Sequence, residues 1–397
     1  MTGIPTGSRA CSIVLATGLL ICSAAAVRAA HAQVAFAEQT TSDLVETLGS
    51  NDPMARAAAA CELGDRGAAT AIPALIKLLA DDTSIEPFTC GRGRWGRDEF
   101  NSPGREAAHA LIDIGQLTAD AVVRVLDHSL GSVREKAVWI LGALDYRPAI
   151  ATILKLLSAD DYFLARANSA WALGAMDVSD ASTSLRSAVR QDEHERVREQ
   201  AAWALGALDA EDAVDELIQA LLEDASSEVR SQAAWALGAI GDQTAAEALS
   251  RALTEDDAVE VRRQSAWALG AVGSKSGVDA LGRALSDSDA DVREQSAWAL
   301  GAIGDARGAA ALANALRDAD ADVRSQAAWA LGAVADVRGV DGLIRALEDE
   351  DADVRSQAAW ALGAIGDPAA ADALAAALKD NNEDVRKQAV WALGALR

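Results

Sequence analysis

The sequence has little proline, little histidine and few aromatic residues other than tryptophan. Its 397 residues include 7 Pro, 4 His, 4 Phe and 2 Tyr. Because alanine and leucine dominate and β-branched residues do not cluster, we expect helices rather than strands. The histidines after residue 32, namely His109, His128 and His194, stand far apart. No nucleophile or metal-binding constellation is therefore expected, and we predict neither an enzyme nor a cofactor.

Positive charge is scarce too. Lysine and arginine number 36 against 60 acidic residues, which gives a net charge of −24 at pH 7. Such a chain repels nucleic acid phosphates and anionic membranes, and it favours cationic partners. Beyond residue 32 the sequence contains no apolar run of about 20 residues, so we expect no membrane insertion.

The first 32 residues differ from the rest. A short apolar run, SIVLATGLLICSAAAV, precedes small residues that end at Ala32, a pattern typical of a secretory signal peptide. We expect export to the periplasm or the outside, with a short linker over residues 33–41. Only Cys61 and Cys90 then remain, and an oxidising compartment allows them to pair. Alternatively, Cys61 is a buried small apolar residue.

Tryptophan recurs in one frame every 31 or 32 residues. The positions are Trp139, Trp171, Trp203, Trp235, Trp267, Trp298, Trp329, Trp360 and Trp391, each with an arginine five residues before it. Two earlier units keep Arg56 and Arg105, with Cys61 and Ala110 in the tryptophan place. A period of this length indicates a solenoid, here of about eleven units. Each unit predicts two antiparallel helices that must stack on their neighbours, and Gly332 with the following Ala335 and Asp336 is expected to loosen the end of the first helix of its unit.

The pattern DVRxQAAWALGAIGD followed by an LxxAL helix resembles a HEAT repeat, of the short type seen in phycobiliprotein lyase subunits. The resemblance covers about residues 42–397. It implies an all-α fold, an α-α superhelix of the HEAT/armadillo type built from about eleven helix pairs. It does not imply one function, because such arrays carry many roles.

A helical wheel predicts where the tryptophans point. It places Ala327 and Leu331 on the buried face of their helix, and Trp329 on the outward side. In HEAT arrays that side lines the concave groove, so the nine tryptophans would form a column along it. Two roles are open. Each ring could fill the joint between adjacent helices, or the column could bind a ligand.

The stretch KQAVWALGAL resembles the armadillo motif QAVWALGN of importin-α, a family whose tryptophan array binds an extended basic peptide. The resemblance implies a similar role for the nine tryptophans. Where that family has Asn four residues after the tryptophan, this chain has Ala, for example Ala302, Ala333 and Ala364. A glutamine three residues before the tryptophan can bond to an extended strand, or instead to a neighbouring helix or water. These glutamines are Gln200, Gln232, Gln264, Gln295, Gln326, Gln357 and Gln388.

The arginine of each unit borders the predicted core, and an acidic residue lies near it in most units. We therefore expect a structural ladder of arginine–carboxylate pairs between repeats. Its central members are Arg230, Arg262, Arg293, Arg324 and Arg355.

One insertion interrupts the period, at residues 81–104. It carries Arg92, Arg94, Trp95 and Arg97 in an otherwise acidic chain. Insertions in solenoids often extend the binding face, and the alternative is a segment that packs over the first units.

We expect an exported scaffold that binds a protein or an extended peptide, basic or apolar in character, through its tryptophan-lined concave face. The alternatives are a lyase-like or cofactor-handling accessory enzyme and a glycan-binding module. The last helix suggests an end-to-end homodimer as well, because Val385, Ala389, Leu393 and Leu396 carry an apolar pattern with no later unit to cover it.

Overall fold

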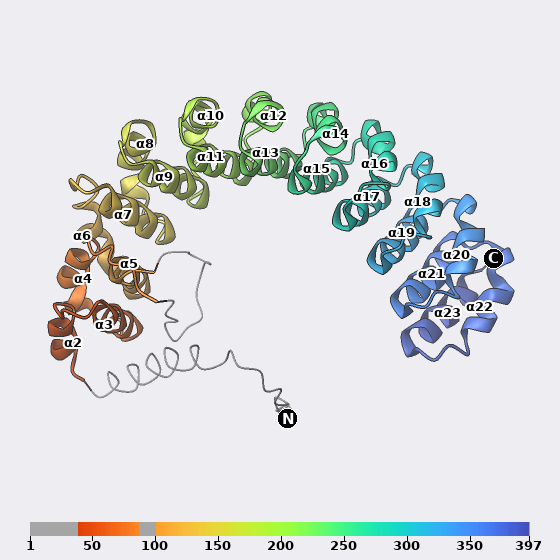
Figure 1. Cartoon of the computed structure of the whole chain (residues 1–397), viewed down its shortest axis with the longest axis horizontal. Coiled ribbons are helices and arrows are strands. Elements are labelled where there is room, and N and C mark those ends of the chain that lie inside the picture. Colours follow the sequence, from red (N-terminus) through yellow and green to blue (C-terminus); the bar gives the residue numbers. More distant parts are fainter. Residues whose placement is uncertain (1–38, 87–100, 397) are drawn as a thin grey trace, which may run out of the picture. The chain divides into compact units, whose positions relative to one another are not determined.

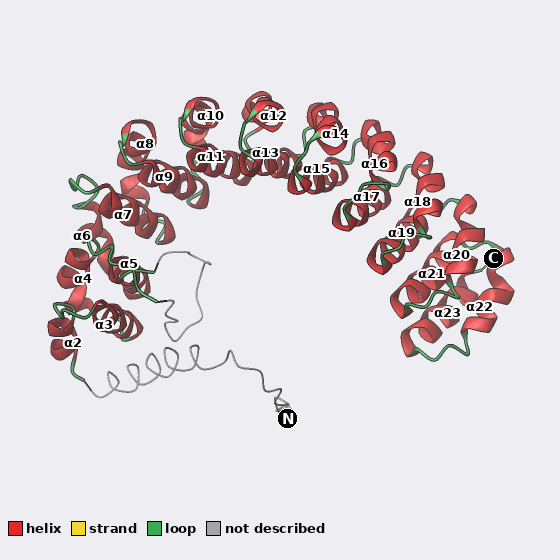
Figure 2. Cartoon of the chain, in the orientation of Figure 1, coloured by secondary structure: helices red, strands yellow, loops and turns green. Residues whose placement is uncertain are grey.

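The computed structural model describes residues 39–86 and 101–396. These residues form twenty-two α-helices, α2 to α23, and the sole β contact among them is a bridge between Ile85 and Asn101. Figure 2 shows this helical content directly. The chain divides into two compact units, Met1–Ile140 and Leu141–Arg397. The expected all-α class is confirmed.

Six helices belong wholly or mainly to the first unit. They are α2 (Thr41–Thr47), α3 (Pro53–Asp65), α4 (Ile72–Leu78), α5 (Pro103–Ile114), α6 (Ala119–Val123) and α7 (Gly131–Ala143). Of these, α2 packs on α3 and α4 packs on α5, while the longer helices α3 and α5 pack on each other.

Long and short helices alternate through the second unit. The long ones are α9 (Phe163–Ala175), α11 (Glu195–Ala207), α13 (Ser227–Ile240), α15 (Val259–Val272), α17 (Ala290–Ile303), α19 (Ala321–Val334), α21 (Ala352–Ile365) and α23 (Glu383–Ala395). The short ones are α8 (Ile150–Ala159), α10 (Ser182–Gln191), α12 (Val214–Glu223), α14 (Ala246–Glu255), α16 (Val278–Ala284), α18 (Ala309–Ala315), α20 (Val340–Ala346) and α22 (Ala371–Ala377). Each short helix packs on the long helix that follows it, and consecutive long helices pack on each other.

A short 3-10 turn leads into each short helix from α4 to α22. These turns are η1 (Ala69–Ala71), η2 (Gln116–Thr118), η3 (Arg147–Ala149), η4 (Ser179–Ala181), η5 (Glu211–Ala213), η6 (Gln243–Ala245), η7 (Lys275–Gly277), η8 (Ala306–Gly308), η9 (Val337–Gly339) and η10 (Pro368–Ala370). With α2 pairing with α3, and so on to α22 with α23, the described chain contains the expected eleven helix pairs.

Within the second unit the helices form two rows. Figure 1 shows the long helices along the inner side of a curved row and the short helices along its outer side. We use the term inner face for the exposed side of the long helices α9 to α23. The eight tryptophans from Trp171 to Trp391 lie on these long helices, and their role as a binding column stays a prediction.

Local sequence sets where a long helix begins and ends. The carboxylate of Asp320 accepts the backbone N–H groups of Asp322 and Val323, which satisfies two donors that the first turn of α19 cannot pair. Gly332 lies in the last turn of this helix, remains helical and is buried. The helix ends at Ala335, where the Ala335–Asp336 pair was expected to loosen it, and Ala335 has the left-handed conformation with φ of +55°.

The core follows the predicted helical spacing. Val323, Ala327 and Leu331 of α19 are fully buried, as is Leu343 of α20. Small alanines dominate where long helices meet, so the helix axes approach closely. The small side chains also leave space beside each contact for one tryptophan ring per repeat.

Candidate binding face

Each inner tryptophan packs against a glycine of the preceding long helix. A Cβ atom added to Gly301 of α17 would lie only 2.6 Å from Cζ3 of Trp329. The same close approach joins Gly142 to Trp171, Gly174 to Trp203, Gly206 to Trp235, Gly238 to Trp267, Gly270 to Trp298, Gly332 to Trp360 and Gly363 to Trp391. Glycine is therefore required in the last turn of the long helices from α7 to α21, and the ring fills the joint between repeats.

The rings nevertheless remain partly accessible. The tryptophans from Trp139 to Trp360 are half-buried. Trp391, on the last described helix, has 49% of its surface exposed. The difference indicates that a following helix covers part of each earlier ring and leaves the rest facing solvent. Filling the joint and offering a surface to a ligand are geometrically compatible roles here.

The seven glutamines form a second column beside the tryptophans. All of them, from Gln200 to Gln388, are half-buried. Within the described residues, the structure records no hydrogen bond from any of their side-chain amides. Each amide precedes its tryptophan by three residues, so the two side chains are neighbours on the helix surface. In α7 and α9 the equivalent positions hold Lys136 and Asn168 instead.

An acidic column, not identified from the sequence, lies seven residues before the tryptophan on the later long helices. All six of its members are exposed: Glu228, Glu260, Asp291, Asp322, Asp353 and Asp384. The earlier long helices break the pattern, since α11 has Arg196 and α9 has Leu164 at this position. The signal is present in the repeated "DVR" and "EVR" segments of the sequence.

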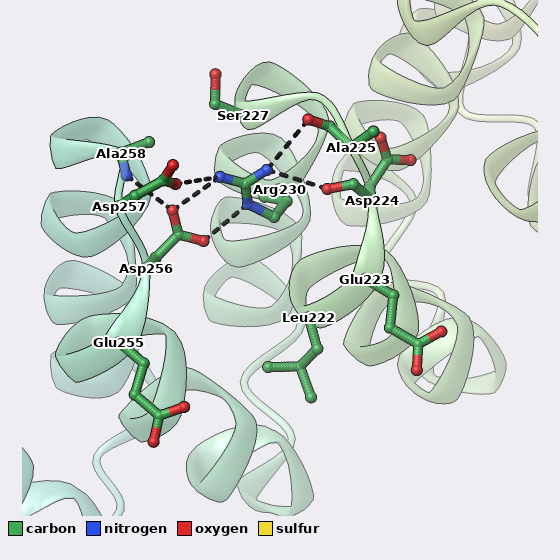
Figure 3. A pocket seen from close by; sticks show the side chains of 10 residues that line it. All are labelled: Leu222, Glu223, Asp224, Ala225, Ser227, Arg230, Glu255, Asp256, Asp257 and Ala258. Carbon is green, nitrogen blue, oxygen red and sulfur yellow. Dashed lines mark hydrogen bonds and ion pairs between the residues drawn. The ribbon is translucent and has the colours of Figure 1, made fainter.

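The arginines form a continuous ladder with aspartates of the following loops. Nε and Nη2 of Arg230 donate to the two carboxylate oxygens of Asp256 at 2.7 and 2.9 Å, and Nη1 donates to the carbonyl oxygen of Asp224 at 3.0 Å (Figure 3). Asp224 in turn accepts from Arg198 of the preceding helix. Each arginine thus ties its own loop to the next one.

The same arrangement recurs along the second unit. The side-chain pairs are Arg166–Asp192, Arg198–Asp224, Arg230–Asp256, Arg262–Asp287, Arg293–Asp318, Arg324–Asp349 and Arg355–Asp380. In the first unit Arg56 pairs with Asp81.

A shallow recess lies between two of these loops. Leu222, acidic residues and Arg230 line it, and the guanidinium of Arg230 already pairs with Asp256 and Asp257 (Figure 3). Burial by itself would raise the pKa of Asp256, but the hydrogen bonds from Arg230 and from the backbone of Ala258, together with the charge of Arg230, outweigh it and hold the pKa below its usual range. The recess is thus part of the ladder.

The first unit departs from the regular pattern. A Cβ on Gly64 would meet Ala110, just as the later glycines meet the alanine directly after each tryptophan. His109, rather than the predicted Ala110, therefore stands in the tryptophan place of α5. Arg105 precedes His109 by four residues, whereas the arginine of each later unit precedes its tryptophan by five, so the constant spacing predicted Ala110 instead.

The predicted insertion residues Arg92, Arg94, Trp95 and Arg97 lie outside the described residues, and so does Cys90. Cys61 is disulfide-bonded, and its partner also lies outside them. The pairing of Cys61 with Cys90 stays a prediction.

The structure contradicts two of the four residues of the apolar strip predicted at the last helix. Val385 and Ala389 are fully buried, whereas Leu393 and Leu396 are half-buried. The exposed apolar side chains of α23 are Val390, with 63% of its surface accessible, and Trp391. End-to-end pairing stays a prediction.

Other kinds of site find little support in the described residues. No group of three or more His, Cys, Asp or Glu side chains in this part of the chain is placed to hold a metal ion. None of the helices formed by residues 39–86 and 101–396 is long and apolar enough to cross a membrane. Burial raises the pKa of Glu106 in α5 to about 7.

Comparison with known proteins identifies the repeat. A HEAT-repeat profile matches residues 119–206, 183–269, 251–320 and 309–394, and a profile of the PBS lyase HEAT-like repeat matches residues 55–81. No curated protein matches the chain in sequence. The expected resemblance to HEAT repeats, with the short PBS-lyase type among them, is confirmed.

Solved structures share the fold. Yeast importin-beta (Kap95p) has a TM-score of 0.62 and 14% identity, with 94% of this chain and 59% of that chain covered. This chain thus spans little more than half the length of Kap95p. An engineered protein has a TM-score of 0.46 and 22% identity over 90% of this chain and 98% of its own. Human deoxyhypusine hydroxylase has a TM-score of 0.30 and 26% identity over 64% of this chain and 98% of its own, too low to support a functional comparison.

Proposed function

The chain belongs to the HEAT-repeat family, and from that premise we propose that it is an exported scaffold that binds a protein or an extended peptide through its inner face. HEAT solenoids are typical of protein-binding scaffolds. One solved relative in fold is a complex of Kap95 with Nup1, that is, of one protein with another.

The observation that carries the proposal is the paired column of glutamine and tryptophan. On each long helix from α11 to α23, a half-buried glutamine lies next to a partly exposed ring. An amide that has no hydrogen bond to the described residues can donate to and accept from an extended backbone, while a ring offers apolar contact. Repetition at a fixed period suits a polypeptide, because its own backbone groups repeat too.

Charge supports a basic partner. The exposed acids from Glu228 to Asp384 lie on the same helices as the glutamines and tryptophans. Their field attracts cationic segments and weakens with salt. A glycan-binding role is the second candidate, favoured by the partly exposed rings alone, since aromatic faces also stack on sugars. No observation in residues 39–86 or 101–396 favours the lyase-like alternative.

The test removes the amides rather than the rings, because the rings also fill the joints between repeats. The triple change of Gln232, Gln264 and Gln295 to Ala is expected to weaken binding of extended peptides at least tenfold, with little change in unfolding free energy. Fluorescence anisotropy with peptides of varied charge measures the affinity, and chemical denaturation measures stability. Gln219→Ala on α12, in the outer row, is the matched control.

Binding that survives the triple change unaltered would contradict the proposal. So would a wild-type protein that binds oligosaccharides but no peptide. Export has its own test: the mature protein recovered outside the cytoplasm should begin at Gln33, and an intact Met1 there would contradict the predicted signal peptide.

A further inference from the structure

The guanidinium of Arg105 stacks on the ring of Trp139, one tryptophan of the array. In the first unit, Cζ of Arg105 lies 4.5 Å from the centroid of the Trp139 ring, and Nη1 of Arg105 donates to Oε1 of Glu135 at 3.0 Å. His109 meets the same ring edge-on, with 4.9 Å between the ring centroids. Glu135 precedes Trp139 by one helical turn, so ring and carboxylate lie on one side of α7. Stacking on the ring of Trp139 and a charge-assisted hydrogen bond to Glu135 act together to fix the guanidinium of Arg105.

The second unit repeats this acid–tryptophan spacing on α11. Glu199 precedes Trp203 by four residues, as Glu135 precedes Trp139. Both Glu199 and Trp203 are half-buried, so each keeps an accessible part. The carboxylate and the ring are again neighbours on one helix surface.

The cation that completes the arrangement in the first unit has no counterpart here. Arg105 lies four residues before His109, which stands in the tryptophan place of its helix. Four residues before Trp171, on the helix that precedes Trp203, the chain has Ala167. An alanine has no charge and cannot reach the ring of the next repeat. Ala167, at the position equivalent to Arg105, therefore supplies no guanidinium to Trp203.

The charges around Glu199 leave room for a cation. Burial raises the pKa of its carboxyl group, and Glu228 and Glu195 raise it further, while Arg196 opposes them. Arg196 is the one ion-pair partner recorded for Glu199 within the described residues, at 3.4 Å, and its own side chain is 57% exposed. A pair whose cation is this exposed contributes little and is readily exchanged. Glu199 thus has one loosely held cation among the described residues.

We propose that Trp203 and Glu199 form a subsite for an arginine side chain of the bound polypeptide, which would lie as Arg105 lies on Trp139. The inference rests on the proposed function and narrows it to arginine-containing partners. Arginine suits the site better than lysine, because a planar guanidinium can stack on a ring and donate to a carboxylate in its plane at the same time.

The test compares a labelled eight-residue glycine peptide that carries one arginine with the same peptide carrying citrulline, which keeps the shape and removes the charge, in about 0.3 M NaCl so that the exposed acidic column is screened. Wild type is expected to bind the arginine peptide about tenfold more tightly, as measured by fluorescence anisotropy. Glu199→Gln, a nearly isosteric change, should reduce that preference to less than about twofold. Glu247→Gln, on the exposed side of α14, is the control and should keep the tenfold preference.

A second variant places the cation within the chain. Ala167→Arg should fill the subsite as Arg105 fills its own, and so should also abolish the preference for arginine. Since Ala167 is buried, this variant counts only if circular dichroism shows an unchanged helix content and melting transition. If the helix content or melting transition of Ala167→Arg changes, the Glu199→Gln variant alone tests the subsite.

The outcomes separate the two proposals. Equal binding of arginine and citrulline peptides by wild type, or a preference that survives Glu199→Gln, overturns the arginine subsite and leaves the scaffold proposal standing. Loss of the preference in Glu199→Gln alone supports the subsite. A wild type that binds no peptide of any charge overturns both.

Discussion

The ring of Trp329 lies so close to Gly301 of the preceding helix that no side chain fits between them. This contact determines how closely two repeats can approach. It also explains why a residue that disfavours helices by about 1 kcal/mol occurs in the last turn of every long helix from α7 to α21.

Gly301→Ala is expected to destabilise the protein by about 2 kcal/mol, because the added methyl group overlaps the indole ring and forces the repeats apart. Urea denaturation measures the change. Gly394→Ala is the control, since no atom lies within 4 Å of its Cβ position. There alanine gains helix propensity without a clash and should be neutral or slightly stabilising. Equal effects at the two positions would contradict the packing argument.

A buried hydroxyl group on α15 predicts a stabilising change. Ser265 is fully buried, and its Oγ has no hydrogen-bond partner. The same position is alanine in most other repeats, for example Ala327, and serine in Ser169 and Ser296. Ser265→Ala should raise the unfolding free energy by about 1 kcal/mol, because the cost of the unpaired hydroxyl disappears.

The control for this change is Ser296 on α17, an equally buried serine whose Oγ donates to the carbonyl oxygen of Val292 at 2.7 Å. Ser296→Ala loses a hydrogen bond along with the hydroxyl and should gain nothing. Thermal denaturation of both variants side by side distinguishes them, and a stabilised Ser296→Ala would show that the hydrogen bond does not matter.

The end of α19 predicts a second stabilising change. Ala335 has a φ of +55°, a left-handed conformation in which a Cβ atom is strained. Gly304 and Gly366 occupy the same place in the neighbouring repeats. Ala335→Gly should therefore stabilise the protein by about 1 kcal/mol, and Gly366→Ala should destabilise it by a similar amount. Melting temperatures that move in the opposite directions would refute the strain.

The sequence predicts what a single repeat determines. Helix pairs, their number and the buried positions such as Ala327 and Leu331 follow from the period and from helical spacing, and all agree with the structure. The contacts between neighbouring repeats were harder to predict. Gly332 was expected, with Ala335 and Asp336, to loosen the end of its helix; the end does lie at Ala335, but Gly332 itself stays helical and receives the ring of Trp360. The contact spans two repeats, and no pattern within one repeat requires it.

The candidate site was predictable only in part, for the same reason. The tryptophan and glutamine columns follow from spacing alone. The cation on Trp139 does not, because Arg105 and Glu135 belong to different helices of the first unit and meet only when α5 and α7 stack. A shorter spacing between Arg105 and His109 had also hidden the equivalence of His109 with the tryptophans.

The arginine–aspartate ladder predicts how stability depends on pH. Both members of the Arg230–Asp256 pair are largely buried, with side chains 13% and 9% exposed. The carboxyl group of Asp256 has a pKa below its unfolded value, so the folded state binds fewer protons than the unfolded state. Its contribution to stability is complete above the unfolded pKa, near 3.9, and is lost as the pH falls through the folded pKa.

Asp256→Asn should therefore cost about 2 kcal/mol at pH 7, and progressively less below pH 4, where wild type loses the same interaction. Urea denaturation at a series of pH values measures both curves. Asp257→Asn is the control: this carboxylate also contacts Arg230, but it is 94% exposed, and an exposed pair contributes little. If the difference between wild type and Asp256→Asn stayed constant down to pH 3, protonation of the ladder would not explain acid unfolding. The same would follow if Asp257→Asn were equally destabilised, because burial would then not be what gives the ladder its strength.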